Sequence, residues 1–225
     1  MNRPKNATAA TRRRPRVALQ AGLVGLLLVS LATNAAAETE KWQTGSADDG
    51  QIAVKYRVSE RANEDGVQVP LIEYVATTTA SVSMHSCLVL LEDPARHSEF
   101  MGDKRSETLA RVSDNEWVVY NYYSAPWPFP DNDRVTKMRL AEDPTRKTAV
   151  VSFSAAPSLL EPRKVKRVSY YSAVYTLEER AAGTVALTLA MKMSPPNKAP
   201  LWMIRAAFPG AGADVLRKLV KLARR

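Results

Sequence analysis

The stretch Ala125-Pro-Trp-Pro-Phe-Pro-Asp-Asn-Asp-Arg134 is the most informative part of the sequence. Its three prolines cannot lie in a helix or in a central strand, because each lacks a backbone N–H group and has a fixed φ. The segments on either side, Trp117–Ser124 and Val135–Leu140, are rich in β-branched and aromatic residues and are predicted to be strands. The stretch is therefore predicted to form a corner between two strands and to hold one indole and one phenyl ring there.

A second proline-rich stretch, Pro195-Pro-Asn-Lys-Ala-Pro-Leu-Trp-Met203, precedes an apolar segment near the C-terminus. These two motifs, in this order, resemble the signatures of START (StAR-related lipid-transfer) domains of the secreted bacterial kind. The resemblance covers the chain from about Trp42 to the C-terminus. It implies an α+β helix-grip (START/Bet v1-like) fold, in which a curved antiparallel sheet wraps a long C-terminal helix around a cavity for one lipid or sterol-like molecule.

The first 37 residues have the pattern of a secretory signal peptide. A basic region around Arg12–Arg16 precedes an apolar stretch from Ala21 to Ala32, and small residues follow at Ala35–Ala37. We expect cleavage after Ala37, which leaves 38–225 as one domain in the periplasm or outside the cell. The alternative is an uncleaved anchor, but a spanning helix needs about 20 apolar residues and this stretch is shorter.

Removal of the signal peptide changes how the charge is interpreted. The first 37 residues carry six of the 32 basic residues and no acidic residue, so cleavage lowers the formal net charge from +9 to +3. The remaining chain has no basic stripe interleaved with aromatic residues, as nucleic-acid binding would require. We therefore expect no nucleic-acid partner.

Alternation of apolar and polar residues predicts eight strands in one domain, and helical spacing predicts three helices. The predicted strands are 52–58, 69–79, 107–112, 117–124, 135–141, 148–154, 168–178 and 184–193. Two short helices are predicted after the second strand, at 81–91 and 95–101. Residues 38–50 are predicted to be a linker.

The C-terminal segment is predicted to cover the apolar face of the last strand. Its apolar residues have helical spacing, but Phe208-Pro-Gly-Ala-Gly212 interrupts them and is predicted to break the helix and to act as the hinge of a lid. Five basic residues follow the break, at Arg217, Lys218, Lys221, Arg224 and Arg225. This pattern allows transient contact with an anionic membrane surface, and an ordinary solvated helix face is the alternative.

The sequence contains little that is typical of catalysis. His85 and His97 have no partner at metal-ligand spacing, and the single cysteine, Cys87, lies among apolar residues as a small buried side chain would. Asp131 and Asp133 fit an acid–base pair, but a turn gives such carboxylates a simpler task, which is to accept backbone N–H bonds or to form an ion pair. We expect no metal, no cofactor and no enzymatic activity.

Candidate ligand-binding residues are aromatic or apolar side chains of the corner, the strands and the C-terminal helix. They are Trp127, Phe129, Tyr120, Tyr122, Met138, Leu189, Met191, Ile204 and Phe208. For the two rings of the corner, packing in the core is the alternative to lining the cavity. In the sterol carriers of the family an arginine lies in the pocket on the strand after the corner, but the corresponding residue here is Met138. This difference argues against a buried ion pair and favours a more apolar ligand or another polar anchor.

The sequence thus predicts a monomeric protein that binds, and transports, a lipid or another hydrophobic small molecule in an internal cavity. The alternative is an enzyme on the same superfamily fold, similar to a polyketide cyclase or aromatase.

Overall fold

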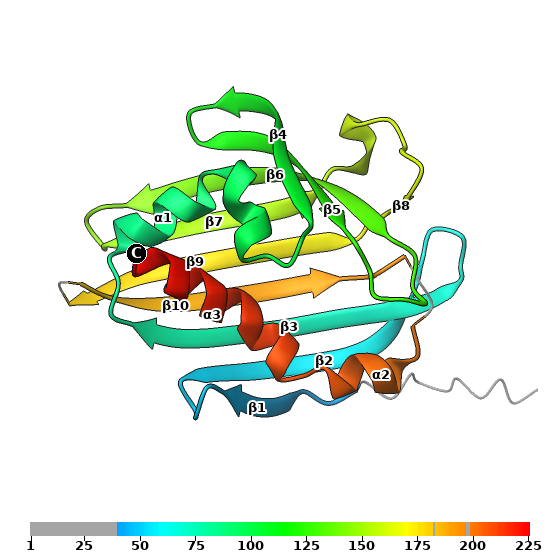
Figure 1. The fold of residues 1–225 in the computed structure, drawn as a ribbon, viewed down its shortest axis with the longest axis horizontal. Helices are drawn as coiled ribbons and strands as arrows, with labels where there is room; N and C mark the ends of the chain where they lie inside the picture. Colours follow the sequence, from blue (N-terminus) through cyan, green and yellow to red (C-terminus); the bar gives the residue numbers. More distant parts are fainter. Residues whose placement is uncertain (1–39, 182, 197–198) are drawn as a thin grey trace, which may run out of the picture. The chain divides into compact units, whose positions relative to one another are not determined.

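A single curved antiparallel sheet is the framework of the protein, seen in a computed structural model that describes residues 40–181, 183–196 and 199–225 (Figure 1). The predicted signal peptide lies outside the described residues. Ten strands are present within them: β1 (Gln43–Ala47), β2 (Ile52–Ala62), β3 (Gln68–Ala80), β4 (Arg105–Ser113), β5 (Glu116–Tyr123), β6 (Asn132–Asp143), β7 (Thr148–Ala155), β8 (Lys166–Arg167), β9 (Tyr171–Ala181) and β10 (Thr184–Met193).

The strands follow the order β1-β2-β3-β10-β9-β7-β6-β5-β4, so the last strand pairs with the third near the middle of the sheet. Every neighbouring pair along this path is antiparallel, and the short β8 pairs with β6 in parallel. The eight predicted strands and the α+β class are confirmed. The predicted strand 168–178 starts three residues too early, because β9 begins at Tyr171.

Two strands were not predicted. The linker expected at 38–50 contains β1, which pairs with β2 along the sheet edge from Gln43↔Tyr56 to Ala47↔Ile52. Its sequence, QTGSA, has no apolar alternation, so its pairing rests on backbone hydrogen bonds rather than on a buried face. The two-residue β8 is too short to give any pattern.

The two early helices lie on one face of the sheet. Helix α1 (Met84–Leu91) begins after Ser83, whose hydroxyl accepts a hydrogen bond from the backbone N–H of Ser86, as an N-cap does. The second predicted helix is a 3₁₀ helix, η1 (Pro94–Glu99), which begins at a proline. A second 3₁₀ turn, η2 (Pro157–Leu159), follows β7.

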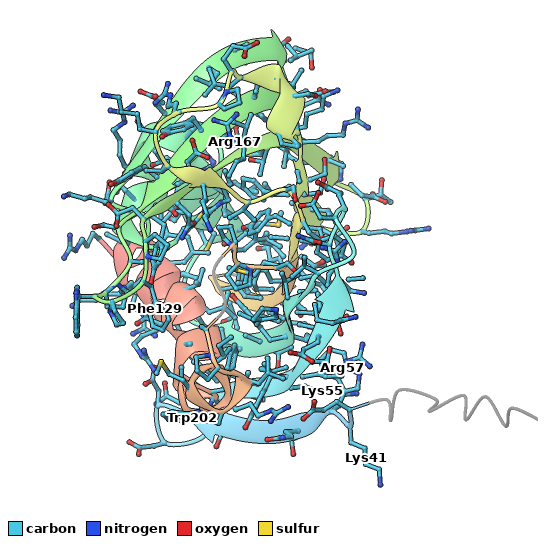
Figure 2. The ribbon with its side chains drawn as sticks, turned by 90° about the vertical axis from the view of Figure 1, so that its right-hand side faces the viewer. Lys41, Lys55, Arg57, Phe129, Arg167 and Trp202 are labelled. Atoms are coloured by element: carbon cyan, nitrogen blue, oxygen red, sulfur yellow. The ribbon has the colours of Figure 1, made fainter. Side chains whose placement is uncertain are left out.

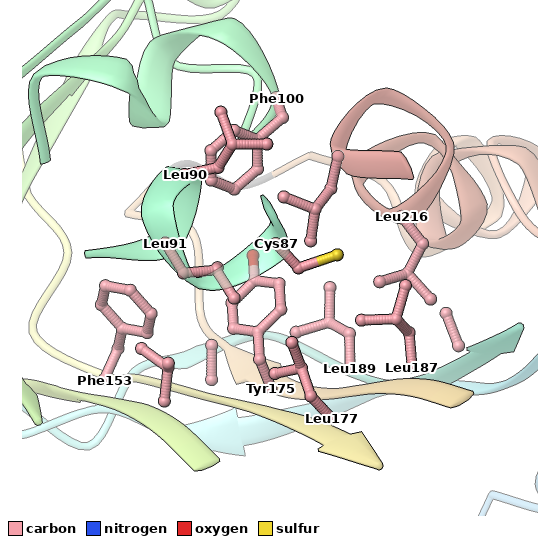
Figure 3. Close-up of a cluster of buried hydrophobic side chains, with 14 of the residues drawn as sticks. Cys87, Leu90, Leu91, Phe100, Phe153, Tyr175, Leu177, Leu187, Leu189 and Leu216 are labelled. Carbon is pink, nitrogen blue, oxygen red and sulfur yellow. The ribbon is translucent and has the colours of Figure 1, made fainter. Parts of the chain in front are cut away.

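The main core fills the space between the sheet, α1, η1 and the C-terminal helix α3 (Gly210–Ala223) (Figure 3). Cys87 and Leu91 of α1 and Leu216 of α3 face Leu187 and Leu189 of β10, and all five are at most 1% exposed. The thiol of Cys87 is thus a buried apolar group, as the sequence predicts. None of the helices among the described residues is long and apolar enough to cross a membrane.

The predicted break of the C-terminal helix is confirmed. Helix α2 (Leu201–Ala206) ends before Pro209, and α3 starts at Gly210 (Figure 1). Pro209 packs closely against Gly45 of the edge strand β1. A Cβ atom added at Gly45 would lie only 2.9 Å from Cγ of Pro209.

The two glycines of the break are expected to respond differently to alanine. A Cβ atom at Gly212 would lie 2.8 Å from Cγ1 of Val54, whereas no heavy atom lies within 4 Å of one at Gly210. We expect Gly212→Ala to lower the free energy of unfolding by about 1–3 kcal/mol through overpacking, and Gly210→Ala to change it by less than about 1 kcal/mol. Urea denaturation measures both values. Equal values for the two variants would contradict the close contact between α3 and β2.

Candidate ligand-binding site

The concave face of the sheet continues beyond the core into a cavity of about 440 Å³. Strand β10 shows the transition: Val185, Leu187 and Leu189 are buried in the core, while Met191 and Met193, further along the same face, line the cavity. The predicted alternation of this strand is therefore confirmed. The core and the cavity share one apolar surface, and the helices cover only part of it tightly.

Three parts of the chain enclose the cavity. They are the strands of the concave face, the two C-terminal helices and the proline-rich corner, from which Phe129 lies beside those helices (Figure 2). The apolar lining includes Ile72, Tyr74, Tyr123, Ala125, Pro126, Phe129, Met191, Met193, Met203, Ile204, Ala207, Phe208, Ala211 and Val215. Phe208 stacks on Tyr56 at 4.9 Å between ring centroids and anchors the junction of α2 and α3 to β2. Such a lining suits an apolar molecule.

One buried ion pair supplies the charge in this lining. Nη2 of Arg134 on β6 lies 2.6 Å from Oδ2 of Asp103, which precedes β4, and their side chains are 13% and 1% exposed. The side-chain amide of Asn121 donates to the same oxygen at 2.9 Å, and the Arg134 guanidinium lies over the ring of Tyr171. The other carboxylate oxygen, Oδ1 of Asp103, is buried without a hydrogen-bond partner. The cavity thus has one charged corner, formed by the Asp103–Arg134 pair.

Burial and the ion pair act in opposite directions on this carboxyl group. Burial raises the pKa of Asp103, and the Arg134 guanidinium and the Asn121 amide oppose that shift. Burial likewise raises the pKa of the Tyr171 phenol, so that phenol stays neutral.

The prediction that the buried ion pair is absent is wrong. Met138 is fully buried in the main core. Arg134 lies four residues before it, on the same face of β6, where the core gives way to the cavity. The signal was present in the sequence, since Arg134 and Met138 lie four residues apart and a strand places such residues on one face. No sequence pattern indicated Asp103, because its partner lies 31 residues away.

The predicted site residues fall into three groups. Phe129, Met191, Ile204 and Phe208 line the cavity together. Met138 and Leu189 lie in the core, and Trp127 is 92% exposed at the tip of the corner. Tyr120 and Tyr122 face the opposite side of the sheet, where they line a second pocket. The ligand-binding role of the first group stays a prediction.

Both aspartates of the corner make structural contacts. Asp131 accepts hydrogen bonds from the hydroxyl of Tyr122 and from the backbone N–H of Ala125 at 2.9 Å. Asp133, whose side chain is fully buried, accepts two hydrogen bonds from Arg167, each at 2.9 Å. These contacts fix the corner and leave neither carboxylate in the lining of the cavity.

His97 is buried beside the core and is expected to make stability depend on pH. Burial lowers its pKa to about 4, partly opposed by the hydrogen bond that its Nε2–H donates to the Leu91 carbonyl at 2.7 Å. Below pH 6.5 the unfolded chain binds a proton that the folded chain does not, so stability falls between pH 6.5 and about 4, by about 3 kcal/mol in all. We expect His97→Gln to remove this slope, and urea denaturation across the pH range measures it. The exposed His85 provides the control, since His85→Gln should keep the slope; an unchanged slope in His97→Gln would contradict the assignment.

The arrangement of these elements defines a class of protein: a curved antiparallel sheet that grips a C-terminal helix around a ligand cavity is the helix-grip fold. Solved structures agree. The chain is similar to a STAR-related lipid transfer protein from Xanthomonas axonopodis, with 25% identity and a TM-score of 0.67 over 82% of this chain and 99% of that one. It is also similar to human STARD10, with 15% identity and a TM-score of 0.64 over 81% of this chain and 73% of that one. The expected resemblance to START domains is therefore confirmed, and the chain has the START fold.

A weaker similarity exists to an enzyme. The Zhui aromatase/cyclase from Streptomyces has 15% identity and a TM-score of 0.51 over 69% of this chain and 94% of that one. No protein-family model matches the sequence. No curated protein matches it either.

Proposed function

We propose that the protein binds one lipid or similar hydrophobic molecule with a polar end and transfers it between membranes. The observation that carries this proposal is an apolar cavity of about 440 Å³ with a single buried ion pair, Asp103–Arg134, in its lining. The similarity to the STAR-related lipid transfer protein from Xanthomonas axonopodis supports the same function.

Desolvation supplies the affinity in this mechanism. Each methylene group of the ligand that leaves water contributes about 0.8 kcal/mol, and ordering of the flexible ligand offsets part of this gain. The Asp103–Arg134 pair sets the orientation, because the Arg134 guanidinium, whose side chain is 13% exposed, offers N–H donors to a polar group of the ligand. A ligand without a polar end would give those donors no hydrogen-bond partner.

Two exposed tryptophans support contact with a membrane at the cavity. Trp127 is 92% exposed and Trp202 67% exposed, and the corner and the helix that carry them both enclose the cavity. Tryptophan side chains bind well at the interface between lipid and water, because one edge of the ring is polar and the body is apolar. The basic residues of α3 are a weaker candidate, because Arg217 and Lys218 already form ion pairs with Asp214.

We propose the periplasm or the cell exterior as the location, because the first 37 residues have the pattern of a signal peptide. The protein would act there as a monomer, without nucleic acid and without enzymatic turnover. A cyclase or aromatase is the rival function, supported by the similarity to the Zhui enzyme. In that case Asp103 and Arg134 would form the polar part of its active site, and replacing either would abolish turnover of a polyketide-like substrate.

We expect replacements at the cavity and at its rim to separate binding from transfer. Phe129→Ala removes part of the lining and should weaken binding of a fluorescent fatty acid by about tenfold. Trp127→Ala together with Trp202→Ala should keep that affinity and slow transfer between vesicles by about tenfold. Titration and stopped-flow transfer assays measure the two quantities.

Opposite results would contradict the proposal. Unchanged affinity in Phe129→Ala would place the ligand elsewhere, and unchanged transfer in the double tryptophan variant would leave both indoles without a role at the membrane. Gly210→Ala provides the corresponding test of the hinge, because it meets no neighbouring atom. Slower transfer at equal affinity would support a lid that moves at this break.

A further inference from the structure

A second pocket, of about 570 Å³, lies on the opposite face of the sheet from the ligand cavity. It is lined by Tyr120 and Tyr122 of β5 and by four cationic side chains: Lys104, Arg105, Arg163 and Lys164. We propose that this outer pocket is a binding site for a phosphate ester. The pocket is separate from the hydrophobic cavity, so this inference goes beyond the proposed function.

Strand alternation separates the two sites. On β5, Tyr123 lines the inner cavity, whereas its chain neighbour Tyr122 lines the outer pocket. The two pockets therefore lie back to back across one layer of the sheet. Tyr120 and Tyr122 both line this outer pocket, although the sequence pattern had placed them in the lipid cavity.

The loop before β8 holds two of the cations over the sheet. Arg167 of β8 (Figure 2) donates to the backbone carbonyls of Pro157 at 3.0 Å, Glu161 at 3.3 Å and Leu160 in this loop. It also pairs with the buried Asp133. Leu160 packs on a small apolar cluster that includes Tyr120. These contacts hold the loop on both sides of Arg163 and Lys164. The two cationic side chains are therefore positioned before any ligand binds.

Aromatic rings and one carboxylate orient the arginines. The Arg163 guanidinium lies 4.0 Å from the centroid of the Tyr120 ring, and that of Arg105 lies 5.5 Å from it. Glu107 accepts from Arg105 at 2.8 Å and lies 3.7 Å from Arg163. This single carboxylate cannot neutralise two arginines, and a planar guanidinium retains further N–H donors after one such contact.

The two lysines supply the remaining charge. Lys104 and Lys164 are exposed and form no ion pair with any residue in the described parts of the chain. Two carboxylates offset part of the charge of the four cations: Glu107, which accepts from Arg105, and Asp131, which accepts from the Tyr122 hydroxyl. An excess of positive charge remains in a concave site with two tyrosine rings. A phosphate group suits this site better than a single carboxylate, because it carries more charge and offers more acceptor oxygens to arginine and lysine.

The phosphate can belong to a soluble ester or to a lipid headgroup, and two probes distinguish these sources. Glycerol 3-phosphate is titrated into the ¹⁵N-labelled protein, and vesicles of phosphatidylcholine with or without phosphatidylglycerol are tested by sedimentation. We expect saturable shifts of the backbone amides of Lys104, Arg105, Arg163 and Lys164. Lys104→Ala together with Lys164→Ala should weaken binding at least about tenfold, because two charged donors are lost.

Lys137→Ala is the matched control, because Lys137 is also exposed but does not line the outer pocket. It lies opposite Val118 of β5, which belongs to the same small apolar cluster as Tyr120. It should bind like the unchanged protein. Additional binding to phosphatidylglycerol that depends on the two pocket lysines would assign the site to a lipid headgroup. Saturation by glycerol 3-phosphate alone would assign it to soluble esters. The inference would be overturned if glycerol 3-phosphate gave no saturable shifts and the vesicles did not bind the protein, or if the double lysine variant bound as well as the unchanged protein. Uptake of a fatty acid into the cavity should be unaffected in every variant.

Discussion

Arg134→Leu is expected to lower the free energy of unfolding by about 3–5 kcal/mol, because it leaves the carboxylate of Asp103 buried without a cation. Only the Asn121 amide would still donate to that carboxylate. Asp103→Leu combined with Arg134→Leu removes both charges and should recover most of the lost stability. Urea denaturation of the single and double variants measures these changes.

The same variants test the role of the ion pair in recognition. The double variant should bind a plain hydrocarbon chain as well as the unchanged protein does, and a lipid with a hydroxyl or carboxyl end at least about tenfold more weakly. Arg57→Leu is the control for the loss of stability. It removes one partner of Glu73 on the outer face, but Lys192 remains 3.1 Å from that carboxylate, so the free energy of unfolding should fall less than in Arg134→Leu. A loss below about 1 kcal/mol in Arg134→Leu, or an unchanged preference for polar-ended lipids in the double variant, would contradict this account.

Ala207→Trp is expected to have the largest effect on ligand binding. Ala207 lies at the end of α2 and lines the cavity, so an indole there would occupy the space of the ligand. An aromatic ring displaces enough apolar contact area to cost about 3 kcal/mol or more, which corresponds to at least about a 100-fold loss of affinity. The fold should persist, because the ring enters a cavity rather than a packed core.

Ala206→Trp provides the matched control for this variant. Ala206 is the adjacent residue, is also exposed, and is not part of the cavity lining. Fluorescent fatty-acid binding to both variants, with circular dichroism to verify folding, makes the comparison. Equal affinity in the two variants would show that the ligand does not occupy this cavity.

The sequence predicted those parts of the fold that carry a repeated pattern. Alternation identified the strands of the apolar sheet, and Pro209 and Gly210 marked the break between the C-terminal helices. The polar edge strand β1 was missed, because its pairing with β2 depends on the backbone and leaves no apolar pattern. The two-residue β8 was missed because it is too short.

The site was harder to predict than the fold. The corner correctly indicated where two strands meet, but which of its rings faces the cavity depends on side-chain directions that the sequence does not give: Phe129 lines the cavity and Trp127 is exposed. Tyr120 and Tyr122 were assigned to the wrong pocket for the same reason, since the two faces of an antiparallel strand differ only by one residue of register. The Asp103–Arg134 pair joins distant segments, and only the assembled sheet brings them together.

The central claim is that the inner cavity holds one hydrophobic molecule with a polar end. Native mass spectrometry of the protein purified from its own host tests this claim most directly, with Ala207→Trp and Ala206→Trp prepared in parallel. The account predicts one such molecule bound per chain in the unchanged protein and in Ala206→Trp, and none in Ala207→Trp. An unchanged protein without any bound molecule, or equal occupancy in all three proteins, would contradict it.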